Sequence, residues 1–196
     1  MADIKSAYEI AMEKIEKLGV PTEAERLRWK HLPEGEKLAA QYLKEKDGNL
    51  LVELAKHPEE IKKYIADGAA GVLIGNIKLP RNDTIKKTNK KVMDGLKLLK
   101  SDKVGVENIY SRIRQLFSHY AEQGEQQKQQ AYQSLRVQVE GQIRQALQQQ
   151  GTAISGRIDA EKHPQFQQEW RRMLTQLDSQ YITLLSEYKQ ELQNIA

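Results

Sequence analysis

The chain has 196 residues, of which 39% are hydrophobic and 30% are charged, and its mean hydropathy is −0.72. It contains no cysteine, which excludes disulfide bonds and thiolate metal sites. The net charge of +4 is concentrated between residues 78 and 103, where nine basic residues stand against three acidic ones. A chain this polar needs elements with a large surface and a narrow buried stripe, and long helices meet that need. We therefore expect an all-α fold.

The first 104 residues predict a cluster of short helices that forms an N-terminal domain. Residues 3–18 carry apolar side chains at helical spacing behind a capping aspartate. Thr22 and Glu25 form the pattern of a capping box at the start of the next helix. Pro33 then stands near the start of a further segment.

Two more helices complete this N-terminal part. The first opens at His57-Pro58 and ends before Pro80. Its small residues predict close approach of a neighbouring backbone; they are Gly68, Ala69, Gly71 and Gly75. Asn82 or Asp83 then caps a lysine-rich helix.

The remaining residues, 105–196, predict a long antiparallel two-helix hairpin with coiled-coil-like packing. Residues 125–150 hold eleven glutamines, but apolar residues recur among them at helical steps. Since glutamine is a good helix former, this stretch is expected to be the solvent face of a long helix. Gly124 either marks a kink or costs about 1 kcal/mol within an unbroken helix.

The second arm of the hairpin begins at Pro164, after a turn-like stretch over residues 151–163. Its apolar residues recur every 3.6 residues or so, which is typical of a nearly straight helix rather than a heptad supercoil. The expected stripe consists of Phe166, Trp170, Met173, Leu177, Tyr181, Leu184, Tyr188, Leu192 and Ile195. The first arm is the longer one, so part of its stripe is left to meet the N-terminal helices or another copy of the chain.

Partner binding is the function that this pattern favours. We expect a non-enzymatic scaffold or adaptor that works by helix–helix packing, as a homodimer and with an unidentified protein. The candidate partner-binding residues are Trp29, Phe166, Trp170, Tyr181 and Tyr188, since Trp and large aromatic residues dominate interface hot spots. Trp29 lies in the polar context RLRWKH and is the better candidate for a docking residue; Trp170 also fits the core stripe.

Nucleic-acid or ribosome association is the alternative. Its candidate contacts lie on the lysine-rich helix and are Lys86, Lys87, Lys90, Lys91 and Lys97. Such contacts bind phosphates and release counterions. Nearby aspartates dilute the charge and no aromatic residue is interleaved for base stacking, so a solvated helix face is the competing interpretation.

Other chemistries find no support in the pattern. The four histidines lack the spacing of a helical zinc site, and no nucleophile motif is present, so we expect no metal, no cofactor and no catalytic residues. The glycines of DGAAGVLIGNIK do not form a phosphate-binding loop. The longest apolar run is too short to cross a bilayer and the first residues resemble no signal peptide, which predicts a cytoplasmic protein.

Four stretches carry a family resemblance. They are MADIKSAYEIAMEKIEKLG at the start, RLRWKHLPEGEKLAAQYL at 26–43, IKLPRND at 77–83 and HPQFQQEWRRMLTQLDSQY at 163–181. With these stretches the chain resembles an uncharacterised family of bacterial helical proteins to which no function is assigned. The resemblance implies a bacterial cytosolic protein and assigns no role to any single residue.

Overall fold

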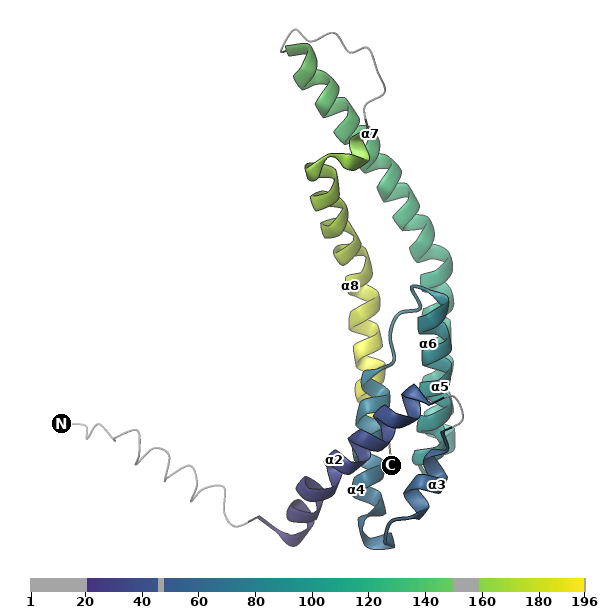
Figure 1. Cartoon of the computed structure of the whole chain (residues 1–196). Helices are drawn as coiled ribbons and strands as arrows, with labels where there is room; N and C mark the ends of the chain where they lie inside the picture. The colour runs from purple at the N-terminus through teal and green to yellow at the C-terminus, as the bar shows by residue number, and fades with distance from the viewer. Residues whose placement is uncertain (1–20, 46–47, 150–158, 196) are drawn as a thin grey trace, which may run out of the picture. The chain divides into compact units, whose positions relative to one another are not determined.

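The structure is a computed structural model that describes residues 21–45, 48–149 and 159–195 (Figure 1). Within these ranges all regular elements are helical, which confirms the all-α prediction. The helix expected over residues 3–18 lies outside the described residues. The chain forms two compact units, residues 1–73 and 74–196. The boundary expected after residue 104 falls inside the second unit, and its role as a folding boundary stays a prediction.

The first unit contains α2 (Glu23–Lys44), α3 (Leu50–Ala55) and most of α4 (Glu59–Gly75). Both hydrogen bonds of the capping box at Thr22 and Glu25 are present, as expected. Pro33 lies inside α2, so the expectation that it stands near the start of a separate helix is wrong. An interior proline removes one backbone hydrogen bond and crowds the carbonyl four residues before it, and α2 tolerates this cost because it is capped at Thr22 and buried at Gly35 and Ala39.

The backbones of α2 and α4 touch where each helix carries a glycine. A Cβ atom on Gly35 would overlap the carbonyl oxygen of Ile65, and one on Gly68 would overlap that of Leu32. The close approach expected from the small residues of α4 is therefore confirmed at Gly68. At Gly71 and Gly75 no described atom lies within 4 Å of such a Cβ, so the expectation is wrong there.

The second unit is built from one long helical run, a second long helix beside it and the lysine-rich helix. The glutamine-rich stretch is helical as expected, with Leu135 and Val139 buried and most glutamines exposed. The elements are α5 (Asp83–Leu99), α6 (Lys103–His119), a π-helical turn (Tyr120–Gly124), α7 (Glu125–Gln149), a short 3₁₀ helix (Ala160–Lys162) and α8 (Pro164–Asn194).

Helix α8 packs along both α6 and α7 (Figure 1). Near one end of α8, Arg112 forms a two-bond ion pair with Glu191, at 2.5 and 2.9 Å. Near the other end the rings of Tyr132 and Phe166 meet edge to face, with centroids 5.2 Å apart. Residue numbers rise along the first arm as they fall along α8, so the pair is antiparallel. Interlocking of the coiled-coil type stays a prediction.

The buried stripe of α8 differs from the expected one in its second half. The buried residues there are Asp178, Tyr181, Leu185, Tyr188 and Leu192, at steps of three and four. Leu184, expected inside, is 36% exposed, whereas Leu185 is 5% exposed. The stripe therefore follows a heptad spacing, because it must keep facing the α6 helix along its length.

Candidate functional site

The π-helical turn between α6 and α7 marks the centre of the candidate site. Inward-facing residues around it step by four, from Leu116 through Tyr120, Gly124 and Lys128 to Tyr132. In an α-helix each step of four rotates the side chain by about 40° relative to the step before. A π-turn has a wider, i to i+5 bonding pattern that absorbs part of this rotation. The turn thus keeps the inner stripe facing α8.

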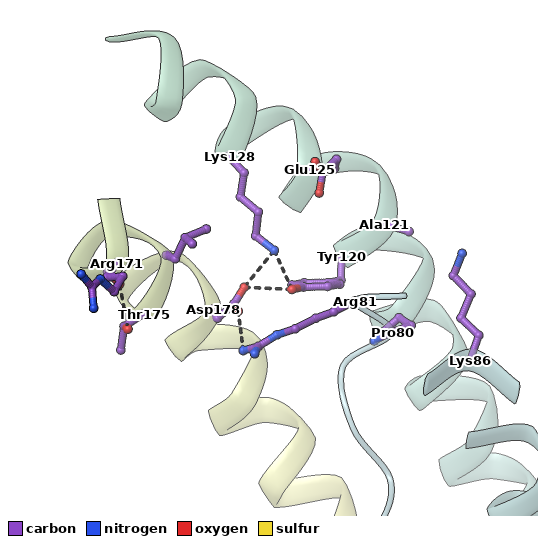
Figure 2. A pocket seen from close by; sticks show the side chains of 11 residues that line it. Pro80, Arg81, Lys86, Tyr120, Ala121, Glu125, Lys128, Arg171, Thr175 and Asp178 are labelled. Atoms are coloured by element: carbon purple, nitrogen blue, oxygen red, sulfur yellow. Dashed lines mark hydrogen bonds and ion pairs between the residues drawn. The ribbon is translucent and has the colours of Figure 1, made fainter. Parts of the chain in front are cut away.

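A buried carboxylate faces this turn from α8. The side chain of Asp178 is 6% exposed and accepts a hydrogen bond of 2.6 Å from Nη2 of Arg81. Its other oxygen accepts from the Tyr120 hydroxyl at 3.0 Å and lies 3.2 Å from Nζ of Lys128. Figure 2 shows Arg81 and Lys128 reaching Asp178 from opposite sides, with Tyr120 beside it. We call these four residues the Asp178 cluster.

The cluster holds its cations in the protonated state. Burial acts to lower the pKa of Lys128, but its hydrogen bonds to Tyr120 at 2.6 Å and to Asp178 outweigh burial and raise the pKa. The pKa of Arg81 is raised in the same way, against the effect of burial. The cluster therefore joins the segment before α5, helix α7 and helix α8 through the contacts of Arg81 and Lys128 with Asp178.

Polar contacts extend from the cluster along α8. The Tyr181 hydroxyl lies 3.0 Å from Nδ1 of His119, and its ring packs edge to face on Tyr120 with centroids 5.0 Å apart. Burial raises the pKa of Tyr181. Gly124 sits beside this ring, since a Cβ there would lie 3.5 Å from the Tyr181 hydroxyl oxygen.

Two open hollows adjoin the cluster on the second unit. The first, of about 600 Å³, is lined by the cluster together with Lys86, Arg171 and others, and carries more positive than negative charge (Figure 2). The second is a groove of about 770 Å³ between α7 and α8, lined by Tyr132, Trp170 and Leu174. We call it the α7–α8 groove. Within the described ranges no three His, Asp or Glu side chains are grouped as a metal ion requires.

A family model described as a family of unknown function, DUF6657, matches residues 51–194. The chain belongs to the DUF6657 family. Membership agrees with the resemblance to a family without an assigned function, and the bacterial origin stays a prediction. No curated protein matches the chain, and no solved structure does.

The DUF6657 match covers α4 to α8 and therefore includes the Asp178 cluster and the α7–α8 groove. It leaves out α2, which carries Trp29. That side chain is 64% exposed, as a docking residue must be. Its role stays a prediction that lies outside the family match.

The other four candidate partner-binding residues lie on α8 within the match. Phe166 is 3% exposed, and Tyr181 and Tyr188 are 9% exposed each, because all three fill the chain's own core. Trp170 is only half-buried; its ring contacts Tyr132 with centroids 5.1 Å apart. Of these residues Trp170 offers the most surface to a partner.

The candidate lysines of the alternative function lie on α5. Lys86, Lys87, Lys90 and Lys97 are exposed and Lys91 is half-buried. Lys86 pairs with Asp83 at 3.1 Å, and Lys97 pairs with Glu107 at 2.9 Å. The lysines are thus presented to solvent, with part of their charge balanced locally.

The Asp178 cluster was missed by the reasoning from sequence. Arg81 lies 97 positions before Asp178 in the sequence, Tyr120 lies 58 before it and Lys128 lies 50 before it. No local sequence motif can therefore contain the cluster. One signal was present. Asp178 precedes Tyr181, Leu185 and Tyr188 at heptad steps, which places a charged residue on the apolar face and calls for a buried counter-ion.

No helix in the described ranges combines the length and the apolar character that are needed to cross a membrane.

Proposed function

We propose that this chain is a non-enzymatic helical scaffold or adaptor that acts by helix–helix packing, as a homodimer. The observation that carries the proposal is the α7–α8 groove, whose aromatic floor of Tyr132 and Trp170 is left partly uncovered. Half-buried aromatic residues in a concave surface are typical of interface hot spots.

The edge of the groove favours a second copy as the occupant. Its α7 side includes Gln129, Gln130 and Gln133, beside one acidic and one basic residue, Glu125 and Lys128. A glutamine amide both donates and accepts hydrogen bonds, so the same row of amides is complementary to itself. A twofold interface, in which the same patch meets on both subunits, needs this property. The proposal also includes binding of the dimer to a second, unidentified protein and a cytoplasmic location for the complex.

Size-exclusion chromatography with light scattering tests the dimer. We expect twice the chain mass of 22.5 kDa at micromolar concentration. The double variant Gln129→Glu/Gln133→Glu should be monomeric, because a symmetric interface brings the new like charges together. The matched control is Gln145→Glu/Gln148→Glu, which adds the same charge to the exposed far part of α7.

The tryptophan fluorescence of a Trp29→Phe variant provides a second readout, since Trp170 is then the remaining tryptophan. Its emission should shift to shorter wavelength as the dimer forms on concentration. A monomeric wild-type chain would contradict the proposal, as would a dimer that both pairs of substitutions weaken equally.

Nucleic-acid or ribosome association is the second candidate, and the exposure of Lys86, Lys87 and Lys90 on α5 favours it. Binding of this kind weakens steeply between about 50 and 200 mM salt. The variant Lys86→Glu/Lys87→Glu/Lys90→Glu/Lys91→Glu should abolish RNA or DNA binding. Absence of binding by the wild-type chain at low salt would exclude this candidate.

A further inference from the structure

A separate hollow of about 360 Å³ lies between the C-terminal half of α8 and the segment that leads into the start of α5. Part of its apolar lining is exposed to solvent, since Ile182 is 49% exposed and Ile85 is half-buried. The apolar residues that line it are Ile77, Leu79, Ile85, Ile182 and Leu185. We call this hollow the Lys189 pocket.

Polar groups complete its lining: the three cations Lys78, Arg81 and Lys189, and the hydroxyl of Ser186. Among the described residues no acidic side chain lines the pocket. Arg81 is balanced by Asp178, but neither lysine forms an ion pair within the described ranges. The lining of the pocket therefore combines apolar surface with positive charge that no ion pair among the described residues balances.

The two lysines repel one another. Burial, and after it the charge of Lys78, lowers the pKa of Lys189. Lys189 donates a hydrogen bond of 3.1 Å to the carbonyl oxygen of Gly75, the last residue of α4. This hydrogen bond caps the C-terminal end of α4 and gives Lys189 a structural role. The capping of α4 gives no role to Lys78 or to the exposed side chain of Ile182.

We propose that the Lys189 pocket binds a small amphiphilic anion, in which a carboxylate or phosphate group is joined to a short apolar chain. Lys78, Lys189 and the Ser186 hydroxyl would hold the anionic group, because they supply both charge and hydrogen-bond donors. The chain would lie over Ile182 and Ile85, whose side chains keep apolar surface open to solvent, and remove that surface from water. The size of the hollow fits a single small ligand. This site is independent of the proposed dimer interface.

The test uses the full-length chain, labelled at isoleucine and leucine methyl groups, and titrates it with octanoate below its micelle-forming concentration. Saturable NMR shifts are expected for Ile182, Ile85 and Leu185. Acetate, which has the charge alone, and octan-1-ol, which has the chain alone, should each bind at least about tenfold more weakly. Octyl phosphate shows which anionic group is preferred.

Substitutions separate the pocket from general charge effects. Lys78→Gln and Lys189→Gln should each weaken octanoate binding by about tenfold. The Lys78 side chain forms no hydrogen bond or ion pair with the described residues, so Lys78→Gln should leave the fold intact even if Lys189→Gln disturbs the end of α4. The matched control Lys87→Gln removes an exposed lysine of α5 and should leave binding unchanged.

The apolar half of the site has its own matched pair. Ile182→Asn should weaken octanoate binding, while Leu184→Asn, two residues along the same helix and also exposed, should not. The proposal is overturned if Lys78→Gln and Lys87→Gln have equal effects, or if acetate reproduces the shifts caused by octanoate.

Sedimentation with anionic phospholipid vesicles identifies the source of the ligand. Vesicle binding that octanoate displaces and Lys78→Gln weakens would assign the pocket to a lipid headgroup with part of its chain. Octanoate binding without vesicle binding would assign it to a free amphiphile. Vesicle binding that survives Lys78→Gln, without octanoate binding, would contradict the site.

Discussion

Asp178 shows how one charged side chain is accommodated on the buried face of a long helix. It occupies a position where the neighbouring heptad residues, Tyr181 and Leu185, are part of the core. A carboxylate in such a place is stable only when its charge is paired and its lone pairs are satisfied. Arg81, Lys128 and Tyr120 together meet both conditions.

Removing this carboxylate should destabilise the second unit strongly. We expect Asp178→Leu to lower the free energy of unfolding by about 3 kcal/mol, because Lys128, 14% exposed, loses its counter-ion. The double variant Asp178→Leu/Lys128→Met should be more stable than Asp178→Leu alone. Urea denaturation followed by circular dichroism measures both.

The control for this experiment is an ion pair on the surface. Arg112 and Glu191 are each more than 40% exposed, so Glu191→Gln should change the free energy of unfolding by less than about 1 kcal/mol. The coupling of Asp178 and Lys128 is measured by comparing Asp178→Leu/Lys128→Met with each single substitution. If the loss of unfolding free energy in the double variant equals the sum of the two single losses, the two side chains are not coupled.

A second prediction at this scale concerns Lys189, whose pKa is lowered by burial and by Lys78. Lys78→Gln should raise this pKa toward the ordinary lysine value without reaching it, since burial remains. NMR titration of the Lys189 side chain measures the change, and Lys87→Gln should have no effect. An unchanged pKa in Lys78→Gln would show that the two ammonium groups do not interact.

The same shift has a defined sign for stability. Because the folded-state pKa lies below the unfolded one, the unfolded chain binds more protons between these two values. The contribution of Lys189 to stability therefore increases as pH rises through that alkaline window. Removing Lys78 should make this increase smaller.

At the scale of elements, the long run from α6 to α7 owes its path to a single π-turn. Four consecutive steps of four inward-facing residues cannot stay on one side of an ideal α-helix. The turn at Tyr120–Gly124 corrects the drift, so that α6 and α7 both present their stripes to α8. Gly124, which the sequence leaves open as a kink or as part of an unbroken helix, is the last residue of this change of helix type.

Two glycines of this run should respond differently to alanine. At Gly141 no described atom lies within 4 Å of the position that a Cβ would take, so Gly141→Ala should stabilise α7 by up to about 1 kcal/mol. At Gly124 a Cβ would lie 3.3 Å from the Tyr120 ring and 3.5 Å from the Tyr181 hydroxyl oxygen. Crowding there should offset the gain in helix propensity.

Thermal unfolding of Gly141→Ala and Gly124→Ala measures the difference. An equal rise in melting temperature for both would mean that the two tyrosines move aside freely and that the π-turn does not depend on glycine.

At the scale of the whole molecule, the second unit includes the lysine-rich helix α5 as part of its core. The Tyr110 hydroxyl of α6 donates a buried hydrogen bond of 2.8 Å to the Met93 carbonyl of α5, and burial raises the pKa of Tyr110. Lys100, just after α5, donates to the carbonyl oxygen of Ile195 at 2.5 Å. These contacts tie α5 to both long arms.

The division of the chain can be tested with two fragments. Residues 74–196 should fold with a cooperative thermal transition, because their core is formed within this unit. Residues 105–196 should lose cooperativity or aggregate, since removal of α5 takes away the Met93 carbonyl that the buried Tyr110 hydroxyl bonds. Circular dichroism melting curves decide between the two boundaries. A fully cooperative 105–196 fragment would instead support the boundary expected from the sequence.

The sequence alone determined the features that depend on neighbours along the chain. The helical character of the glutamine-rich stretch follows from propensity and apolar spacing, and the helix starts at Thr22, Asn82 and Pro164 follow from capping chemistry. These interactions span four residues or fewer, so a short window of sequence contains them.

Only the tertiary structure decided which of two adjacent residues faces inward and which distant charges meet. Leu184 and Leu185 are chemically identical, and the packing of α8 within the second unit buries the second. The π-turn, the Asp178 cluster and the Lys189 pocket likewise depend on side chains brought together across tens of residues. Their geometry is fixed by the packing of one helix against another, and the order of residues along one helix does not specify that register.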